Sequence, residues 1–407
     1  MSRQRRIADF LGLQRNIVLL LLALVLAGTG ERLWLGFAPK YLETLGAGIL
    51  VIGLFDALQT LLGALYNYPG GWLTDRLGQR KSLLIFSAIS VGGYALVLLW
   101  PHWLALLLGA FLFVAWGALS LPATFSVVAT SLDATQHTMG IGVQSLVRRV
   151  PMMLGPLLGG WLITRHGWEQ GVRLALIGCI VLGIAMAVFQ WLMAESRDAT
   201  PQKARNGAAI SFIGVVKSFT PALRELLVSD ILIRFCERLP YAFVILWAMN
   251  HAGLNAQQFG WLLTVEMVTA MLCYIPVAHL ADKYGRRPFV LITFGFFTLF
   301  PVTLLWADTF GWLVVAFVVR GLKEFGEPVR KALILGQAQP ESRARTYGAY
   351  YLIRDCVVTT GSLLGAWLWS LGPRANFLGA AAFGLSGTFW FWWFRCRRAE
   401  QRIQNEK

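Results

Sequence analysis

The stretch GWLTDRLGQR, residues 71–80, is a basic run with glycine at two positions, and it lies between two apolar segments. A related run, AHLADKYGRR, occupies residues 278–287, so its aspartate follows the first one at an offset of 207 residues. Similar stretches at a fixed period indicate a duplicated structural unit. The two runs therefore predict a chain built from two related halves.

Other regions of the chain repeat at nearly the same distance. Residues 31–33, Glu-Arg-Leu, recur as residues 237–239 at an offset of 206. The same offset joins Pro122 with Pro328, Arg148 with Arg354, Gly155 with Gly361, Gly159 with Gly365 and Trp161 with Trp367. A nearly constant offset over several regions predicts duplicated six-helix bundles, related by an axis along the membrane normal.

The composition indicates a membrane protein. Of the 407 residues, 57% are apolar and 14% are charged, and the mean hydropathy is +0.59. Because a membrane-crossing helix needs about 20 mostly apolar residues, this apolar content suffices for ten to twelve crossings and excludes a disordered or ordinary soluble protein. We predict an all-α membrane protein with 12 transmembrane helices, centred near residues 27, 61, 90, 116, 150, 183, 238, 269, 297, 321, 358 and 385.

The net charge of +15 is unevenly distributed along the chain. In a soluble domain it would suggest a nucleic-acid partner, which we do not expect here. Of the 36 Lys and Arg residues, 22 lie in segments assigned to the cytoplasm, whereas the opposite loops hold four and the spans hold ten. Positive charge marks cytoplasmic loops. We therefore expect a multi-pass protein of the inner (plasma) membrane with both termini in the cytoplasm.

One connection between spans is much longer than the others. It runs from Glu195 to about Glu225, and residues 210–219 carry apolar side chains at helical spacing. We predict an N-terminal six-helix bundle over residues 1–195, a cytoplasmic linker with a surface-lying amphipathic helix over 196–224, and a C-terminal six-helix bundle over 225–407.

The run from Gly71 to Lys81 fits the pattern G-x-L-x-D-R-x-G-x-R-K, which resembles the signature of the major facilitator superfamily. The departures are Gln79, where a basic residue is usual, and Ala278 in the second copy, where glycine is usual. The resemblance covers essentially the whole chain. It implies a gating function for ten residues of the two copies: Gly71, Asp75, Arg76, Gly78, Arg80, Asp282, Lys283, Gly285, Arg286 and Arg287.

This resemblance also implies a class of activity, namely a secondary transporter whose two bundles alternately open a central cavity lined by helices one, four, seven and ten. No G-x-x-x-x-G-K-[ST] loop is present, so gradients rather than ATP would supply the energy. The five cysteines have no zinc-site spacing. We therefore expect no enzyme activity, no cofactor and no bound metal. The expected partners are a small-molecule solute, protons and the lipid bilayer. We expect the protein to be a monomer.

Ionisable groups within the spans are functional candidates, because they are costly in a bilayer unless paired or hydrated. Glu31 and Arg32 lie in the first span, and Glu237 and Arg238 lie at the equivalent place in the seventh. Neighbouring helix positions diverge by about 100°. We thus expect one member of each pair to face the cavity and the other to face an adjacent helix.

The tenth span carries a stripe of charge. Arg320, Lys323, Glu324, Glu327, Arg330 and Lys331 fall within an arc of about 120° at 100° per residue. Three i,i+4 pairs are predicted: Arg320 with Glu324, Lys323 with Glu327, and Glu327 with Lys331. Pro328 would kink the helix beside the stripe. The matching arc of the fourth span is uncharged, so we predict a cavity with unequal charge on its two sides.

Several groups remain as candidates for coupling or binding. A proton carrier must exchange its proton during transport, and the candidate acids are Glu31, Glu237, Glu324, Glu327, Asp56 and Glu266, of which the last two are alternatively salt bridges between the halves. Arg148 and Arg149 need partners such as Glu31, and Asp355 is placed to pair with Arg354. Gly155, Pro156, Gly159 and Gly160 resemble the G-P-x-x-G-G element of proton-coupled exporters, which we expect at the bundle interface.

The sequence predicts a proton-coupled transporter of a small polar or charged solute, with a preference for export. Two symmetric arginines, Arg32 and Arg238, resemble those of organophosphate and phosphate exchangers, so an anion exchanger or symporter is an alternative. Residues 30–34 resemble the first helix of ferroportin, which makes a metal exporter through Glu31, Cys236 and Glu237 a second one. A membrane sensor or assembly factor that does not transport is a third.

Overall fold

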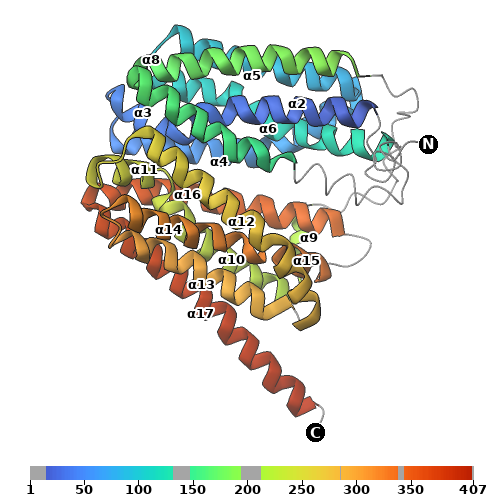
Figure 1. Ribbon diagram of the computed structural model, residues 1–407. Helices are drawn as coiled ribbons and strands as arrows, with labels where there is room; N and C mark the ends of the chain where they lie inside the picture. The colour runs from blue at the N-terminus through green and yellow to red at the C-terminus, as the bar shows by residue number, and fades with distance from the viewer. Residues whose placement is uncertain (1–14, 132–146, 194–211, 285, 338–342, 406–407) are drawn as a thin grey trace, which may run out of the picture. The chain divides into compact units, whose positions relative to one another are not determined.

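The computed structural model describes residues 15–131, 147–193, 212–284, 286–337 and 343–405 (Figure 1). Within these ranges every regular element is helical, and each of the twelve predicted span centres lies in a helix. The elements are α2 (Arg15–Trp34), η1 (Leu35–Phe37), α3 (Ala38–Thr44), α4 (Ile49–Leu77), α5 (Gln79–Leu99), α6 (Trp103–Ser131), α8 (Arg149–Trp191), α9 (Phe212–Lys217), α10 (Pro221–Tyr241), α11 (Val244–Leu246), η2 (Trp247–His251), α12 (Ala256–Tyr284), α13 (Arg286–Leu304), α14 (Phe310–Leu322), η3 (Lys323–Gly326), α15 (Glu327–Gly336), α16 (Arg343–Leu371) and α17 (Pro373–Asn405).

Seven of the described helical stretches are long and apolar enough to cross a membrane by length and composition alone. One of them, α8, contains two predicted spans, because Gly167 turns the chain between them with φ 79°. Only glycine adopts this conformation without strain. Helix α10 is not among the seven, since charged side chains interrupt its apolar face: Arg224, Glu225, Asp230, Arg234, Glu237 and Arg238.

The chain divides into two compact units. The first unit comprises Met1–Ala47, Leu58–Gly207 and Asn255–Thr264, and the second unit comprises Gly48–Ala57, Ala208–Leu254 and Val265–Lys407. The two short segments in this division, from the beginnings of α4 and α12, correspond to each other at the repeat offset of 207. Each unit therefore includes ten residues from the other half of the sequence. The two ten-residue segments occupy equivalent positions in the repeat.

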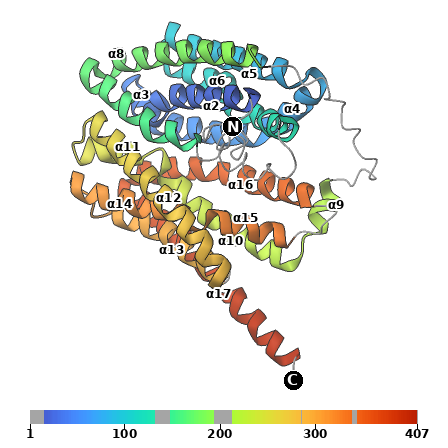
Figure 2. The ribbon, with the colours of Figure 1, turned by 45° about the vertical axis from the view of Figure 1, so that its right-hand side comes forward.

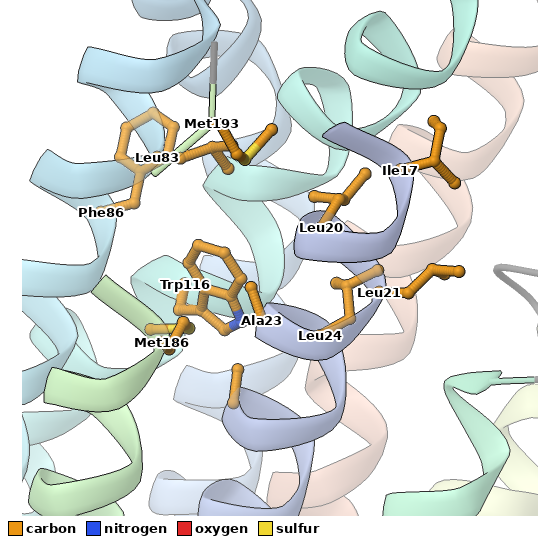
Figure 3. Close-up of a cluster of buried hydrophobic side chains, with 11 residues drawn as sticks. Ile17, Leu20, Leu21, Ala23, Leu24, Leu83, Phe86, Trp116, Met186 and Met193 are labelled. Carbon is orange, nitrogen blue, oxygen red and sulfur yellow. The ribbon is translucent and has the colours of Figure 1, made fainter. Parts of the chain in front are cut away.

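The core of the first unit forms around the face of α2 that carries Leu20, Ala23 and Leu24, which lie at helical spacing and are nearly inaccessible to solvent. Figure 3 shows these side chains facing the aromatic and sulfur-containing side chains of α5, α6 and α8, including Phe86, Trp116 and Met186, and that of Met193, which follows the end of α8. This packing fixes the position of α2, which carries Glu31 and Arg32 further along the helix.

The second unit is built around α10. Ile233 on this helix packs against Phe294 and Phe297 of α13. The short helix α9 contributes Val215, which is buried together with Phe219 in a cluster formed with α10, α15 and α16. The last turns of α17 project beyond the other helices of the unit in both views (Figures 1 and 2).

Close helix contacts repeat in both units at the predicted offset. A Cβ atom added to Gly159 would lie 1.7 Å from the carbonyl oxygen of Leu33, and one added to Gly365 would lie 2.3 Å from that of Leu239. Small residues allow such approach of helix backbones. The offset that relates these residues in sequence therefore also relates helix contacts in space, α2 with α8 and α10 with α16.

Candidate functional site

The first unit contains two adjoining cavities, of about 320 and 240 Å3, which share Glu31 and Gly117. We call them together the first-unit cavity. The larger cavity is lined by Glu31, Leu35, Gln59, Gly63, Phe113, Val114, Gly117 and Ala118. The smaller one is lined by Leu24, Gly28, Glu31, Arg32, Trp116, Gly117, Ser120, Arg148, Pro151 and Met152. Helices α2, α4, α6 and α8 thus supply its walls.

Glu31 and Arg32 both line the smaller cavity. The prediction that one of the two faces a neighbouring helix instead is wrong for this pair. The base of Arg32 does pack on α8, because a Cβ atom added to Gly155 would lie 2.4 Å from the Arg32 Cβ. The cavity extends along that side of α2 as far as Pro151 and Met152. The long guanidinium side chain consequently reaches the same space as the carboxylate.

Arg148 brings a second cation to this cavity. Its Nε atom is buried and has no hydrogen-bond partner among the residues that the structure describes, and the negative charge of Glu31 acts on its guanidinium group. Among the described residues, Glu31, Arg32 and Arg148 have no ion pair within 4.0 Å. The predicted pairing of Arg148 with Glu31 is therefore electrostatic and is not a direct contact. The cavity thus holds one acid and two bases that form no direct ion pair with any residue that the structure describes.

The equivalent residues in the second unit, Glu237, Arg238 and Arg354, each form a direct ion pair. Glu237 accepts hydrogen bonds from Lys323 Nζ at 2.7 Å and from Arg234 Nη1 at 2.6 Å. Lys323 also lies 3.5 Å from Glu266, which is 3.1 Å from Arg320 Nε. A single series of ion pairs thus connects α10, α12, α14 and η3 within this unit.

Asp230 extends the network. This aspartate is inaccessible to solvent and pairs with Arg330, while Arg354 Nη1 lies 3.6 Å away and the Tyr350 hydroxyl donates a hydrogen bond of 3.1 Å. Arg234 Nη2 and Arg330 Nη2 reach the same carboxylate oxygen of Glu327, at 3.0 and 2.6 Å. The sequence interpretation did not single out Asp230 or Arg234. Their i,i+4 spacing, continued to Glu237 on one helix face, is the signal that identifies them.

The charged stripe of the tenth span does not pair along its own helix as predicted. Within the described part of this span, Arg320 with Glu324 and Lys323 with Glu327 are not ion pairs, whereas Lys331 lies 3.6 Å from Glu327. The reason is the 3-10 turn η3 between α14 and α15, which changes the angular position of the side chains on either side of it. The sequence predicted a kink at Pro328, and the helix is instead interrupted at Lys323–Gly326, just before this proline. Arg320 and Lys323 accordingly pair with acids on other helices.

The two symmetric arginines differ in their surroundings. Arg238 Nη1 donates to Asp56 Oδ1 at 3.1 Å, and Ser362 donates to the other oxygen of Asp56 at 2.5 Å. All three residues belong to the second unit, because Asp56 lies in its short α4 segment. Glu266 also pairs inside this unit. Asp355 accepts a hydrogen bond of 2.7 Å from Arg354, as the sequence predicted.

The repeat offset explains why one unit has a cavity where the other has ion pairs. Lys323 corresponds to Gly117, Arg234 to Gly28 and Asp230 to Leu24. Each of these three residues of the first unit lines the cavity. A Cβ atom added to Gly117 would lie 4.0 Å from Glu31 Oε2. The first-unit cavity thus lies where side chains of the second unit neutralise Glu237 and Arg354.

The glycine-proline element of α8 packs on both sides. Gly155 and Gly159 contact α2, whereas a Cβ atom added to Gly160 would lie 2.5 Å from the carbonyl oxygen of Ala256, at the start of α12. The Pro156 carbonyl oxygen lies 2.4 Å from an added Cβ atom of Gly260. This element therefore supports the wall of the cavity that carries Arg32 and Arg148.

The motif at residues 71–80, for which the resemblance implies a gating function, lies where α4 meets α5. Gly78 joins these helices with φ 84°, Arg76 lies over the Trp72 ring at 5.3 Å, and Arg80 lies over the Trp191 ring at 5.5 Å. In the second copy, Lys283 lies over Tyr284 and Arg287 is exposed. The side chains of Asp75, Asp282 and Arg286, as well as Gly285, lie outside the described residues.

Two repeated helical units, with buried ionisable groups around a cavity, define a multi-pass membrane protein of the transporter class. The profile of the Major Facilitator Superfamily matches residues 20–249 and 226–407. The chain therefore belongs to this superfamily, whose members are secondary transporters and not enzymes.

Similar proteins cover nearly the whole chain. It is 24% identical over 412 residues to "Multidrug resistance protein MdtG" of Serratia proteamaculans (strain 568), covering 97% of this chain and 98% of that protein. It is 25% identical over 411 residues to the protein of that name in Dickeya zeae (strain Ech586), covering 97% of each.

Solved structures show the same fold at lower identity. A crystal structure of the nucleoside transporter NupG, in a mutant form, matches with a TM-score of 0.79 and 14% identity, covering 92% of this chain and 98% of that one. A structure of the peptide transporter POT in complex with sulfate matches with a TM-score of 0.74 and 15% identity, covering 95% and 94%.

Proposed function

We propose that this protein is a proton-coupled exporter of a small organic solute, which binds in the first-unit cavity and competes there with a proton for Glu31. The observation that carries this proposal is the contrast between the units. Glu31, Arg32 and Arg148 line a cavity without direct charge partners among the described residues, whereas the equivalent Glu237, Arg238 and Arg354 are ion-paired.

The contacts of the other buried acids favour Glu31 as the carrier. Glu237, Glu266 and Glu327 each lie within 4.0 Å of a cation in the second unit, and Asp56 lies 3.1 Å from Arg238. An acid held in this way loses its ion pair when it is protonated, at a cost of several kcal/mol, about 3–5 when one partner of a buried pair is removed. Glu31 exchanges a proton without breaking a direct ion pair. Glu324, which also has no ion pair within 4.0 Å among the described residues, is the second choice.

Two further points support export across the inner membrane. Relatives that cover 97% of this chain carry the name multidrug resistance protein, which fits the removal of compounds from the cytoplasm. The excess of Lys and Arg in the segments assigned to the cytoplasm supports an orientation with both termini inside. The solute and the proton would then move in opposite directions.

The second candidate function is anion transport, and the buried, unsatisfied Nε of Arg148 favours it. A guanidinium group binds phosphate or carboxylate well. Arg238 does not serve this function as first expected, since Asp56 already neutralises it, so Arg32 and Arg148 would form the anion site. For a metal exporter, the described residues contain no group of three or more His, Cys, Asp or Glu side chains that is placed to hold an ion.

Reconstituted vesicles with an imposed pH gradient test the transport proposal. We expect at least one member of a panel of amines, anions, zwitterions and metal ions to move when the gradient is applied and to stop when it is collapsed. Glu31→Gln should uncouple this flux from the gradient, because an amide cannot take up the proton. Glu43→Gln, which changes an acid paired with Lys40 outside the cavity, serves as the matched control.

Two results would contradict the proposal. If no member of the panel moves, the sensor or assembly role gains the support that transport loses. If flux through Glu31→Gln follows the pH gradient as it does in the wild type, Glu31 is not the coupling residue, and Glu324→Gln becomes the next variant to measure.

A further inference from the structure

We propose that the first-unit cavity binds a zwitterion, with a cationic nitrogen of the ligand against Glu31 and an anionic group against Arg148. This inference rests on the proposed function, because it names the class of solute for the same cavity. The second unit supplies the argument, since its side chains occupy the positions that are empty in the first.

The cationic half of the ligand follows from the Glu237 contacts. Glu237 receives the ammonium group of Lys323 at 2.7 Å. At the repeat offset, Glu237 corresponds to Glu31 and Lys323 corresponds to Gly117, which has no side chain. The space beside Glu31 at Gly117 is part of both cavities. An ammonium group entering this space from solution would supply the partner that Lys323 supplies in the other unit.

The anionic half follows in the same way from Arg354. This arginine lies 3.6 Å from Asp230 and 2.7 Å from Asp355. The corresponding residues beside Arg148 are Leu24, which cannot accept a hydrogen bond, and Arg149, which carries the wrong charge. Arg148 therefore has neither of these two carboxylates, and its buried Nε has no hydrogen-bond partner within the described part of the chain. A carboxylate or phosphonate of the ligand would satisfy it.

A ligand with only one charge satisfies only part of the site. A simple amine would neutralise Glu31 but leave the buried Nε of Arg148 without an acceptor among the described residues, and a simple anion would supply that acceptor but leave Glu31 without a cation from the ligand. Removing water from a charged group that then has no partner is costly. A ligand that carries both charges supplies a partner to each residue at once.

The walls between the two charged positions define the rest of the ligand. Leu24, Val114, Trp116 and Met152 present apolar or aromatic surface to the cavity. Binding sites for small molecules are mostly apolar with a few polar groups that fix the orientation. The expected ligand is therefore a small molecule whose ammonium and acidic groups are joined by an apolar or aromatic body.

The test uses four probes that share an aromatic ring: benzylamine, benzoate, and two zwitterions with different charge spacing, phenylalanine and 4-(aminomethyl)benzoate. Their dissociation constants are measured on the purified full-length protein by thermal shift. We expect at least one zwitterion to bind about tenfold or more tightly than either single-charge probe, because it forms two charge-assisted contacts instead of one. If both zwitterions bind no better than the better of benzylamine and benzoate, the proposal is wrong.

Substitutions assign each half of the ligand to its residue. Glu31→Gln should weaken the binding of benzylamine and lower the affinity for the zwitterion to the affinity for benzoate. Arg148→Gln should weaken the binding of benzoate and lower the affinity for the zwitterion to the affinity for benzylamine. Glu43→Gln and Arg165→Gln, at positions outside the cavity, should leave all constants unchanged. Zwitterion affinity that is indifferent to both cavity substitutions would also overturn the proposal.

Gly117 provides a variant that does not remove a charged residue from the cavity. Gly117→Lys places a tethered ammonium beside Glu31, as Lys323 lies beside Glu237, so it should abolish the binding of benzylamine while benzoate still binds. Gly117→Met fills a similar volume without charge and should weaken both probes alike. Equal behaviour of the two variants toward both probes would mean that Gly117 is not the ammonium position.

The outcome separates this inference from the proposed function. Flux of another solute under a pH gradient, with none of the zwitterions bound, would leave the exporter in place and overturn the zwitterion. Binding of a zwitterion through both Glu31 and Arg148, without flux of any solute under a pH gradient, would support the zwitterion site and overturn the exporter.

Discussion

At the scale of single residues, the expected role of a buried acid or base in this protein depends on whether an oppositely charged side chain lies within ion-pair distance. Asp230 and Glu31 are both carboxylates within the spans of the chain. Asp230 is inaccessible and binds Arg330 and Tyr350, whereas Glu31 lines a cavity. The first arrangement stabilises the fold, and the second leaves the carboxylate available to a ligand or a proton.

Asp230→Asn should therefore destabilise the protein. The substitution removes the inaccessible anion that lies between Arg330, whose side chain is 2% exposed, and Arg354, and it leaves Arg330 with Glu327 as its remaining ion-pair partner. Removing one member of a buried ion pair costs about 3–5 kcal/mol, so we expect a clear fall in the midpoint of thermal unfolding in detergent. Asp308→Asn is the control, because that carboxylate is 64% exposed and pairs with His251. Equal unfolding midpoints for the two variants would contradict the structural role of Asp230.

Arg32→Ala tests the opposite kind of residue. Arg32 lines the cavity and has no direct ion pair among the described residues. Its replacement by alanine therefore breaks no ion pair between described residues of the protein. We expect unchanged insertion and an unfolding midpoint close to that of the wild type, with transport reduced by tenfold or more, roughly the value of one charged contact. Normal flux in this variant would exclude Arg32 from the transport site.

At the scale of helices, glycines set how closely α2 and α8 approach. Gly159 lies so near α2 that a side chain there would overlap the carbonyl group of Leu33. We expect Gly159→Ala to prevent correct packing of the first unit and to lower the yield of folded protein, as judged by size-exclusion chromatography. Gly92→Ala in α5, where an added Cβ atom meets nothing within 4 Å, should change nothing. Comparable yields would show that α2 and α8 tolerate a larger separation.

The helices also show where sequence reasoning succeeds and where it stops. Apolar runs and the motif at residues 71–80 predicted the helices and the repeat, because both depend on local composition and spacing. The pairs Arg320 with Glu324 and Lys323 with Glu327 were predicted wrongly, because i,i+4 spacing brings side chains together only on a continuous α-helix, and η3 interrupts the helix between them. The sequence predicted a central cavity with unequal charge on its two sides, but it did not identify which residues open the cavity of the first unit, because these residues have no side chains, such as Gly28 and Gly117.

At the scale of the whole molecule, the duplication has produced two units with the same helix contacts but different interiors. The first unit keeps an open cavity beside its charged residues, and the second unit fills the same positions with ion pairs. The two units therefore need not contribute equally to transport. In the proposed function the first unit binds the solute and the proton. The charged side chains at the equivalent positions of the second unit are neutralised by ion pairs within that unit.

This division of roles predicts an asymmetry between equivalent variants. The double variant Glu237→Gln with Lys323→Met removes an acid and a base together, so no uncompensated charge remains from that pair, and replacing both members of a buried pair is often nearly neutral for stability. We expect it to retain flux that responds to the pH gradient. Glu31→Gln, at the equivalent position of the first unit, should abolish that response.

Flux measurements in vesicles, with the two variants reconstituted at equal protein content, compare them directly. A double variant that has lost the pH response while it unfolds at the wild-type temperature would place coupling in the second unit, and the first-unit cavity would then bind solute alone. Retained coupling in the double variant, together with its loss in Glu31→Gln, would assign proton exchange to the first unit, whose Glu31 forms no direct ion pair among the described residues.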